Sequence, residues 1–299
     1  MNVRRRVRVM LAVLLSLGAL PGCRDASQAE SAPDKPNGAG PAQRIAVLSP
    51  AMAIIIRDLG QGDRIVARHG WDMATDVEIP VAGDQRGIDY EVLLGTGPDL
   101  ILLESGAEPV PSRLRELANR NEWRIVRLPM LTLADIRSAV LELDQLTAPA
   151  APSARALELV EAFDESLRPQ PGVPSHAGRV VMIVSADPPG VLGPGSFHYE
   201  IGHAMGLDME PLDGAPFINM SAEELRALNP DTVVFIVPGA ADEQSSTMLE
   251  PLASLGMRAV ERGGIILVTD AESLTPSTAM IRFAQDLRSQ FEALPVLGD

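Results

Sequence analysis

The sequence predicts an α/β fold of two lobes with mainly parallel sheets, joined by one long backbone helix. Three observations lead to this prediction. Short β-rich runs alternate with helical segments from Arg44 onward, a pattern typical of parallel sheets covered by helices. A unit of short helix, Pro-Asp turn and buried strand occurs twice. A long segment without Gly or Pro, residues 153–168, lies between the two units. Each lobe is therefore expected to be Rossmann-like.

The segment SARALELVEAFDESLR, residues 153–168, is expected to form the helix between the lobes. It is rich in Ala, Leu, Arg and Glu, which are good helix formers, and Ser153 suits the N-cap. Pro149 and Pro152 precede it and Pro169 follows it, where a helix would end. At 1.5 Å per residue it would span about 24 Å, enough to bridge two lobes. The alternative is an ordinary connecting helix within one domain.

The remaining elements follow from hydrophobic periodicity and from helix start and stop signals. Strands are expected at residues 44–48, 64–67, 99–104, 124–128, 179–185, 232–237 and 265–268. Helices are expected at residues 49–59, 88–95, 111–121, 133–146, 196–206, 221–228, 246–255 and 276–291.

An internal repeat supports two related lobes. The stretches YEVLLGTGPDLILL and AEELRALNPDTVVF each carry a glutamate, Glu91 or Glu223, seven residues before a Pro-Asp turn, and a buried strand follows. Each unit comes after a strand that opens with an arginine, Arg44 or Arg179. The same order in both halves indicates two lobes of one design.

Charge restricts the classes of partner. The chain has 299 residues and a formal net charge of −15. Loss of Arg4, Arg5, Arg6 and Arg8 with a signal segment would take that charge to −19. Nucleic acids and anionic lipids require basic surfaces, so neither is an expected partner. A surface this acidic favours a partner that presents arginines.

The N-terminus predicts export. Residues 1–22 have an arginine-rich start and an apolar run too short to span a bilayer, which is typical of a signal peptide. The only cysteine, Cys23, follows Leu-Pro-Gly and resembles the lipidated cysteine of the bacterial lipobox, although Pro21 is an unusual occupant of its position. The alternative is a chance cysteine at a conventional cleavage site. We expect a lipid-anchored protein on the periplasmic side of a membrane, without disulfides.

These observations divide the chain into five parts. After the signal peptide, residues 23–42 are polar and rich in Pro, Gly and Ala, and are expected to be a disordered tether. Residues 43–150 form the N-terminal lobe, residues 151–170 the backbone helix and residues 171–299 the C-terminal lobe. A monomer is expected.

From Arg44 to Glu292 the chain resembles the cobalamin, iron-siderophore and haem-binding proteins of ABC importers, whose lobes are joined by one long helix. In the first half the resemblance rests on RIAVLSPA, GQGDRIVA and YEVLLGTGPDLILL. In the second half it rests on PPGVLGPGSF, MSAEELRALNPDTVVF and TDAESLTPSTAMIRFAQDL. It implies a receptor that captures a metal chelate between its lobes and delivers it to a membrane permease.

The resemblance implies a role for the two repeated glutamates. Glu91 and Glu223 match the carboxylates that dock into arginine pockets of the permease, an arrangement that suits charge-assisted, bidentate contacts. Each glutamate alone would also suit a solvated helix face or a cap. Glu224, the neighbour of Glu223, is the residue most easily confused with it.

The ligand is expected in the crevice between the lobes, at the carboxyl ends of the strands. The residues expected there are Ser49, Pro50, His69, Trp71, Asp72, Gln85, Arg86, Gly190, Val191, Phe217, Asn219 and Asp270. Trp71 and Phe217 would be apolar walls, or else core residues. His69 would be an axial metal ligand or a surface residue. Arg68 and Arg86 would contact an acidic chelate or lie on the surface.

Two features weigh against particular ligands or chemistries. The cobalamin-binding pattern has aromatic residues where this chain has Gly70, Gln85 and Gly190, which puts cobalamin itself in doubt.

His198 and His203 are five residues apart, not the four that place two metal ligands on one helix face, and no HExxH motif is present. We therefore expect no metal site of the protein's own, no cofactor and no catalytic residues. The alternatives are an orphan envelope lipoprotein that senses or stores a ligand, and a metalloenzyme with its site in the crevice.

Overall fold

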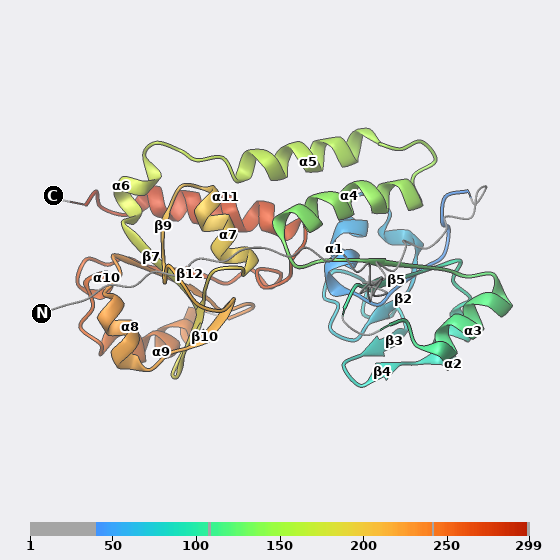
Figure 1. The fold of residues 1–299 in the computed structure, drawn as a ribbon, viewed down its shortest axis with the longest axis horizontal. Coiled ribbons are helices and arrows are strands. Elements are labelled where there is room, and N and C mark those ends of the chain that lie inside the picture. Colours follow the sequence, from blue (N-terminus) through green and yellow to red (C-terminus); the bar gives the residue numbers. More distant parts are fainter. Residues whose placement is uncertain (1–39, 107–108, 241, 298–299) are drawn as a thin grey trace, which may run out of the picture. The chain divides into compact units, whose positions relative to one another are not determined.

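The computed structural model describes residues 40–106, 109–240 and 242–297. In this part of the chain two six-stranded sheets, mainly parallel, are each accompanied by helices, which confirms the α/β fold of two Rossmann-like lobes (Figure 1). The predicted signal peptide, Cys23 and residues 24–39 of the predicted tether lie outside the described residues.

The first lobe contains a sheet with the order β4-β3-β2-β1-β5-β6, in which only the edge strand β4 is antiparallel to its neighbour. Its strands are β1 (Ile45–Val47), β2 (Ile65–His69), β3 (Val81–Asp84), β4 (Gly87–Ile88), β5 (Leu100–Glu104) and β6 (Arg124–Leu128). Its helices are α1 (Pro50–Asp58), η1 (Gly62–Arg64), α2 (Tyr90–Thr96), α3 (Ser112–Asn121) and α4 (Leu133–Thr147).

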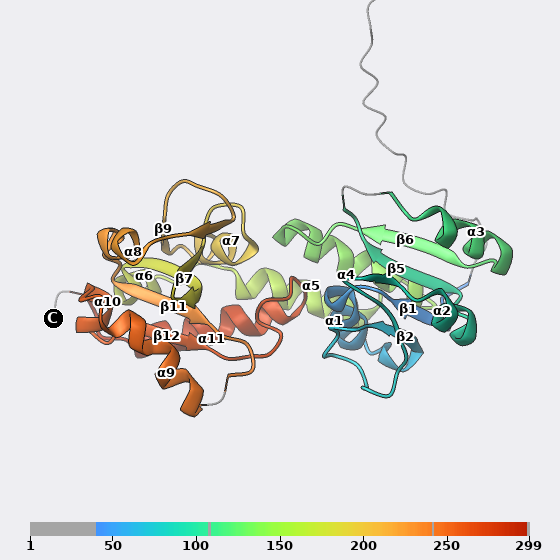
Figure 2. The ribbon, with the colours of Figure 1, turned by 90° about the horizontal axis from the view of Figure 1, so that it is seen from below.

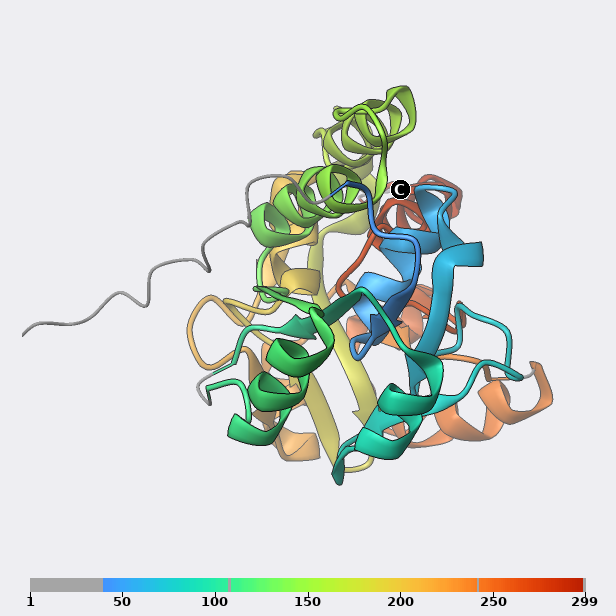
Figure 3. The same cartoon turned by 90° about the vertical axis from the view of Figure 1, so that its right-hand side faces the viewer.

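Alternation along the strands explains why helices cover both faces of this sheet (Figure 3). Ile45 and Val47 of β1 pack in the same core as residues of α1 and α4. Ala46, between them, packs with Leu93 of α2 and Leu114 of α3. The buried strands are therefore apolar on both sides, as expected for a parallel sheet.

The second lobe contains a sheet with the order β10-β8-β7-β11-β12, and β9 pairs with β7. Its strands are β7 (Arg179–Ala186), β8 (Pro189–Leu192), β9 (Asp208–Glu210), β10 (Phe217–Asn219), β11 (Thr232–Ile236) and β12 (Ile265–Val268). Its helices are α6 (Val173–Ala177), α7 (Phe197–Ala204), α8 (Ala222–Leu228), α9 (Asp242–Ala253), α10 (Arg258–Glu261) and α11 (Ala279–Ala293). Figure 2 shows β7, β11 and β12 side by side.

The repeat seen in the sequence is also a repeat in hydrogen bonding. The Asp99 carboxylate accepts the backbone N–H of Arg44 at 3.3 Å, and the Asp99 N–H donates to the Arg44 carbonyl. In the second lobe the Asp231 carboxylate accepts the N–H of Arg179 at 3.0 Å, and the Asp231 N–H donates to the Arg179 carbonyl. Each Pro-Asp turn thus fixes an arginine at the start of the neighbouring strand, Arg44 just before β1 and Arg179 as the first residue of β7.

The helix before each turn ends in the same way. Gly97 and Asn229 both adopt the left-handed backbone conformation, with φ of 53° and 43°, which glycine and asparagine tolerate best. The arginine side chains complete both ends, because Arg44 donates to the Gly97 carbonyl at 3.0 Å and Arg179 donates to the Asn229 carbonyl at 2.7 Å. The arginine side chains thus supply hydrogen-bond donors to carbonyls at the C-terminal ends of α2 and α8, where helical carbonyls lack partners within the helix.

The helix expected between the lobes is α5 (Ala154–Ser166), with Ser153 as its N-cap. It packs against α4 of the first lobe and α11 of the second (Figure 1). One apolar core includes residues of α1, α4, α5, α7 and α11. The lobes therefore share a core, and α5 is one of several helices that hold them together.

Five strands lie outside the predicted ones. β3 with β4, and β8 with β10, form antiparallel pairs added to a parallel sheet, and β9 pairs in parallel with β7. All five are two to four residues long and three of them contain Gly, so hydrophobic periodicity does not mark them. The last helix begins at Ala279 instead of Pro276, because a turn from Asp270 to Thr278 precedes it.

Candidate functional site

A hollow of about 620 Å³ lies in the first lobe, at the carboxyl ends of its parallel strands. Leu48 follows β1, His69 ends β2, Glu104 ends β5 and Arg127 lies near the end of β6. This is the edge of an open α/β sheet where ligands bind in general. Its apolar lining comes from Leu48, Pro50, Trp71, Leu103 and Val110.

Ser49, expected in the cleft, does not line this hollow. Its side chain caps α1 by accepting the N–H of Met52 at 3.2 Å, and its hydroxyl donates to the Glu104 carboxylate at 2.6 Å. The residue is fully buried, so it positions Glu104 and is not itself on the surface. Pro50, at the first position of α1, lines the hollow.

Trp71 is the largest apolar side chain in the lining, and 63% of its surface is exposed. This excludes the alternative that it is a core residue. His69 is half-buried beside it, and its Nδ1 accepts the backbone N–H of Trp71 at 3.1 Å. Burial lowers the pKa of His69, although the carboxylates Glu104, Asp84 and Asp72 act in the other direction.

Asp72 and Arg68 hold the loop that carries Trp71. The buried Asp72 carboxylate accepts the N–H of Ala74 at 2.8 Å and the hydroxyl of Thr75 at 2.6 Å. The Arg68 guanidinium donates to the carbonyl of His69 at the end of β2 and to three carbonyls of the loop, those of Asp72, Val77 and Ile79. Both side chains are occupied by the loop, and Asp72 is a structural residue instead of the expected cleft residue.

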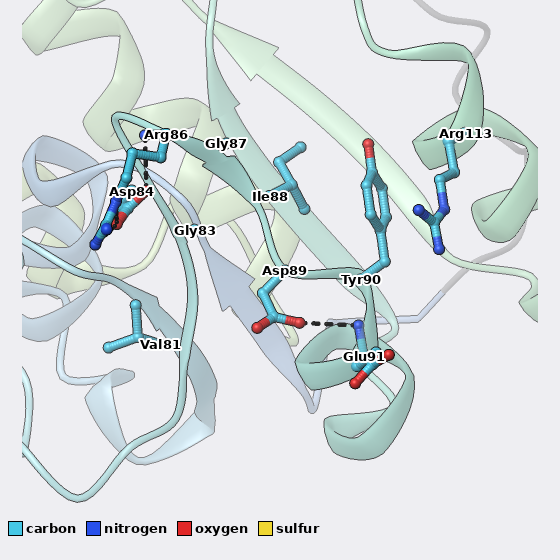
Figure 4. Close-up of a pocket in the computed structure, with 10 residues that line it drawn as sticks. All are labelled: Val81, Gly83, Asp84, Arg86, Gly87, Ile88, Asp89, Tyr90, Glu91 and Arg113. Atoms are coloured by element: carbon cyan, nitrogen blue, oxygen red, sulfur yellow. Dashed lines mark hydrogen bonds and ion pairs between the residues drawn. The ribbon is translucent and has the colours of Figure 1, made fainter.

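Gln85 and Arg86 lie in the turn between β3 and β4, and neither lines the hollow beside Trp71. Arg86 lines a second open hollow, of about 470 Å³, between this hairpin and the helices α2 and α3. Figure 4 shows Arg86 paired with Asp84, at 3.1 Å, on one side of that hollow. On the other side the Arg113 guanidinium stacks over the Tyr90 ring, 4.4 Å from its centre.

The residues predicted in the second lobe lie on β8 and β10. Gly190 pairs with Ser185, near the carboxyl end of β7, and with Asn219 of β10. The Phe217 ring is half exposed and leans over Gly190, where a Cβ would come within 3.1 Å of it. Asn219 is exposed, whereas Val191 is fully buried. Val191 is therefore a core residue instead of the expected cleft residue.

Asp270 begins the loop that follows β12, and its carboxylate pairs with Arg282 at 3.3 Å. Two residues later, Glu272 contacts the first lobe through a bidentate ion pair with Arg57 of α1, with one N–O distance of 3.0 Å. Burial acts to raise the pKa of Glu272, but hydrogen bonds from Arg57 and Arg282 outweigh it and hold that pKa below its usual value. The strand ends of the second lobe thus carry a contact between the lobes.

The predicted docking glutamates occupy equivalent places. Glu91 is the second residue of α2 and Glu223 is the second residue of α8, and both are exposed. The N-caps are Asp89 and Ser221. Glu224, one position further, closes a capping box by accepting the Ser221 N–H at 2.7 Å, and this hydrogen bond lowers the pKa of Glu224. Its carboxylate is thus engaged by its own helix, unlike that of Glu223.

The histidines of α7 do not form a metal site. His198 is buried against Phe283, and its Nε2 is 2.7 Å from the Ser273 carbonyl; burial lowers its pKa to about 4. His203 is exposed. Among the described residues no three His, Cys, Asp or Glu side chains are grouped to hold a metal ion.

Two polar residues of the first hollow were not predicted, Glu104 and Arg127. Each lies at or near the carboxyl end of a predicted strand, so the rule that pointed to Ser49 and His69 would also have found them. Val110, in the loop after β5, has no signal in the sequence.

No family model matches the chain, and no curated protein matches it. Solved structures do. The periplasmic vitamin B12 binding protein BtuF of Vibrio cholerae is 20% identical with a TM-score of 0.62, over 85% of this chain and 98% of that one. A periplasmic heme binding protein from Pseudomonas aeruginosa is 20% identical with a TM-score of 0.65, over 86% and 95%.

A third structure, a possible iron-binding (periplasmic solute-binding) protein from Staphylococcus epidermidis, is 20% identical with a TM-score of 0.62, over 84% of this chain and 98% of that one. At this identity the comparisons establish the fold alone: the same two-lobed α/β arrangement, matched over nearly the full length of each solved structure.

Proposed function

We propose that this chain is an ABC-transporter solute-binding protein that captures a metal chelate of the iron-siderophore, cobalamin or haem class between its lobes. It delivers the chelate to a membrane permease and catalyses no reaction. The observation that carries the proposal is the hollow at the strand ends of the first lobe, with Trp71 exposed beside it. The solved structures of this fold include proteins named for vitamin B12 and heme, which supports the ligand class.

Capture would draw on apolar contact. The Trp71 side chain is 63% exposed, and covering it with a flat ligand would contribute about 3 kcal/mol at roughly 25 cal/mol per Å² of apolar surface. Phe217, half exposed on β10, would supply apolar surface from the second lobe. Such contacts suit a macrocycle or chelate with an apolar face.

Closure of the lobes on the ligand would be limited. The shared core, the Arg57–Glu272 ion pair and a hydrogen bond of 2.6 Å from the Thr278 hydroxyl to Asp58 all connect the two lobes. A spectroscopic distance between labels on the lobes should change little when the ligand binds. A change of many ångströms would contradict this part of the proposal.

Delivery would use Glu91 and Glu223, whose equivalent positions at the start of α2 and α8 present one carboxylate from each lobe. Arginine pockets of a permease could then recognise the spacing of the two lobes as well as their charge. The chain would act as a monomer held to the membrane by lipidated Cys23. Among the described residues no helix is long and apolar enough to cross a bilayer.

The test is tryptophan fluorescence of the full-length chain, titrated with haem, cobalamin and ferric siderophores. Trp71 and Trp123 are the only tryptophans, and Trp123 packs against the core on the other side of the sheet from α1. Ligand quenching should disappear in Trp71→Phe and persist in Trp123→Phe. Absence of quenching and of calorimetric heat with every chelate would contradict the proposal and favour an orphan lipoprotein with another ligand.

A further inference from the structure

His69 is held in one orientation by its own loop. It is the last residue of β2 and lines the hollow next to Trp71. Its Nδ1 accepts the backbone N–H of Trp71 at 3.1 Å. An N–H group can only donate, so this contact requires a lone pair on Nδ1.

The tautomer of the ring follows from that contact. In a neutral imidazole one nitrogen carries the proton and the other accepts, so an accepting Nδ1 places the proton on Nε2. Burial lowers the pKa of His69, and the ring is therefore neutral near pH 7, even though Glu104, Asp84 and Asp72 face it with opposing effect. Among the described residues Nε2 makes no hydrogen bond.

This arrangement, in which Nδ1 accepts a hydrogen bond and Nε2 carries the proton, is the reverse of what a metal-binding histidine requires. A histidine that binds a metal through one nitrogen donates the N–H of the other to a carbonyl or carboxylate, which fixes the tautomer. Here the second nitrogen faces a donor, the N–H of Trp71. Ligation through Nε2 would turn two N–H groups toward each other, and ligation through Nδ1 would break the contact with Trp71.

The rest of the polar lining is suited to an organic ligand. The Glu104 carboxylate, held by the Ser49 hydroxyl at 2.6 Å, offers an acceptor. The Arg127 guanidinium lines the same hollow and donates to the Gly106 carbonyl at 3.0 Å. The hollow therefore has two kinds of hydrogen-bond donor, the Nε2–H of His69 and the Arg127 guanidinium. They lie beside the Glu104 carboxylate and the apolar side chain of Trp71.

We propose that His69 donates its Nε2–H to an oxygen on the organic periphery of the ligand, a carboxylate or an amide carbonyl, and makes no bond to the metal. The ligand class is then an apolar macrocycle or chelate with oxygen acceptors at its edge, recognised independently of its metal. This inference rests on the proposed function and makes it more specific.

The first test compares His69→Gln with His69→Ala in the full-length chain, with haem, cobalamin and ferric ferrichrome as probes. Glutamine retains an N–H donor, so His69→Gln should bind within about twofold of the native chain. Alanine removes one hydrogen bond and should weaken binding about 3- to 10-fold. His203→Ala, an exposed histidine of α7, is the control that should change nothing. Equal losses in His69→Gln and His69→Ala would overturn the inference.

The second test removes the metal. Metal-free protoporphyrin IX should bind within about threefold of haem, and the absorption spectrum of bound haem should be the same in His69→Ala. The inference would be overturned, and the proposed function left standing, by two results together. Protoporphyrin IX would bind more than tenfold more weakly than haem, and the absorption spectrum of bound haem would change in His69→Ala. Failure of all three chelates to bind would overturn the proposed function, and this inference with it.

Discussion

The two lobes are alike at their outer turns and unlike at the carboxyl ends of their strands. In both, a Pro-Asp turn fixes an arginine at the start of the neighbouring strand, and a glutamate occupies the second position of the helix before that turn. At the strand ends, the first lobe has a hollow lined by Trp71 and His69. The second has Phe217 over Gly190, and a loop that binds the first lobe.

The similar outer turns and the dissimilar strand ends suit the two different tasks of the proposed function, delivery and capture. In the proposed function a permease contacts both lobes and needs the same feature twice, which the helices α2 and α8 would provide. A ligand has no such symmetry, so the strand ends are free to differ. Matched substitutions at the two Pro-Asp turns should therefore both reduce stability, whereas substitutions at the strand ends should affect each lobe differently.

The largest effect on stability is expected at the Pro-Asp turns. Asp231 is 5% exposed, and its carboxylate accepts the Arg179 N–H and pairs with Arg258 at 3.0 Å. Asp231→Ala leaves these groups without their partner and should lower the free energy of unfolding by about 2–4 kcal/mol. Chemical denaturation measures this.

Asp99→Ala, at the equivalent turn of the first lobe, should also destabilise the chain, by about 1–2 kcal/mol, because Asp99 is only partly buried. Asp99→Asn and Asp231→Asn keep one acceptor oxygen, so each should lower the free energy of unfolding by less than the alanine variant does. Full tolerance of either alanine variant would show that the two turns are not equivalent.

A smaller effect is expected at the contact between the lobes. Glu272→Gln weakens the ion pairs with Arg57 and Arg282 and should cost about 1–2 kcal/mol at pH 7, since the pair is partly exposed. Because the folded pKa of Glu272 is depressed, its contribution is present above the unfolded glutamate pKa, about 4.3, and is lost as pH falls through the folded pKa.

The difference in stability between the native chain and Glu272→Gln should therefore shrink below about pH 4.3. Thermal unfolding from pH 7 to pH 3 measures it. Arg168, exposed and two residues beyond the end of α5, pairs with Glu165 at 2.6 Å, and Glu165→Gln is the control with little expected effect. A difference that is constant over this range would mean that the Glu272 contact is not ionic.

The smallest effect is expected from Gly190→Ala. The new methyl group would come within 3.1 Å of the Phe217 ring, which is half exposed and can move, so the cost should be below about 1 kcal/mol. If Phe217 contacts the ligand, affinity should change more than stability does. Titration and denaturation of the same variant compare the two. Unchanged affinity would restrict the ligand site to the first lobe.

The sequence predicted the parts that depend on regular patterns. Buried strands such as residues 124–128 and 265–268 match the structure because their apolar runs are bounded by clear helix ends. The start of α1 at Ser49-Pro50 was also predicted from its cap. Short, Gly-rich strands such as β8 were not, since their pairing depends on neighbours distant in the sequence.

The candidate site was predicted less completely, for the same reason. Pro50, His69 and Trp71 were expected in the crevice between the lobes because they lie near strand ends, and they line the hollow of the first lobe. The rule of strand ends could not show that Asp72 is engaged by its own turn or that Val191 faces the core, because hydrogen bonding and facing direction are set by tertiary packing. The tautomer of His69 also depends on one backbone contact that no sequence pattern encodes.

The central claim of the proposed function is that ligand binding and delivery use different residues of the same lobes, the hollow beside Trp71 for binding and Glu91 with Glu223 for delivery. It is tested most directly by measuring uptake and ligand affinity for Glu91→Lys combined with Glu223→Lys. Each lost charge-assisted contact corresponds to about 10- to 150-fold, so uptake should be abolished while the Kd for the chelate is unchanged. Glu116→Lys with Glu161→Lys, at exposed positions of α3 and α5, is the control of equal charge. Undiminished uptake in the Glu91 and Glu223 variant, or a parallel loss of affinity, would contradict the account.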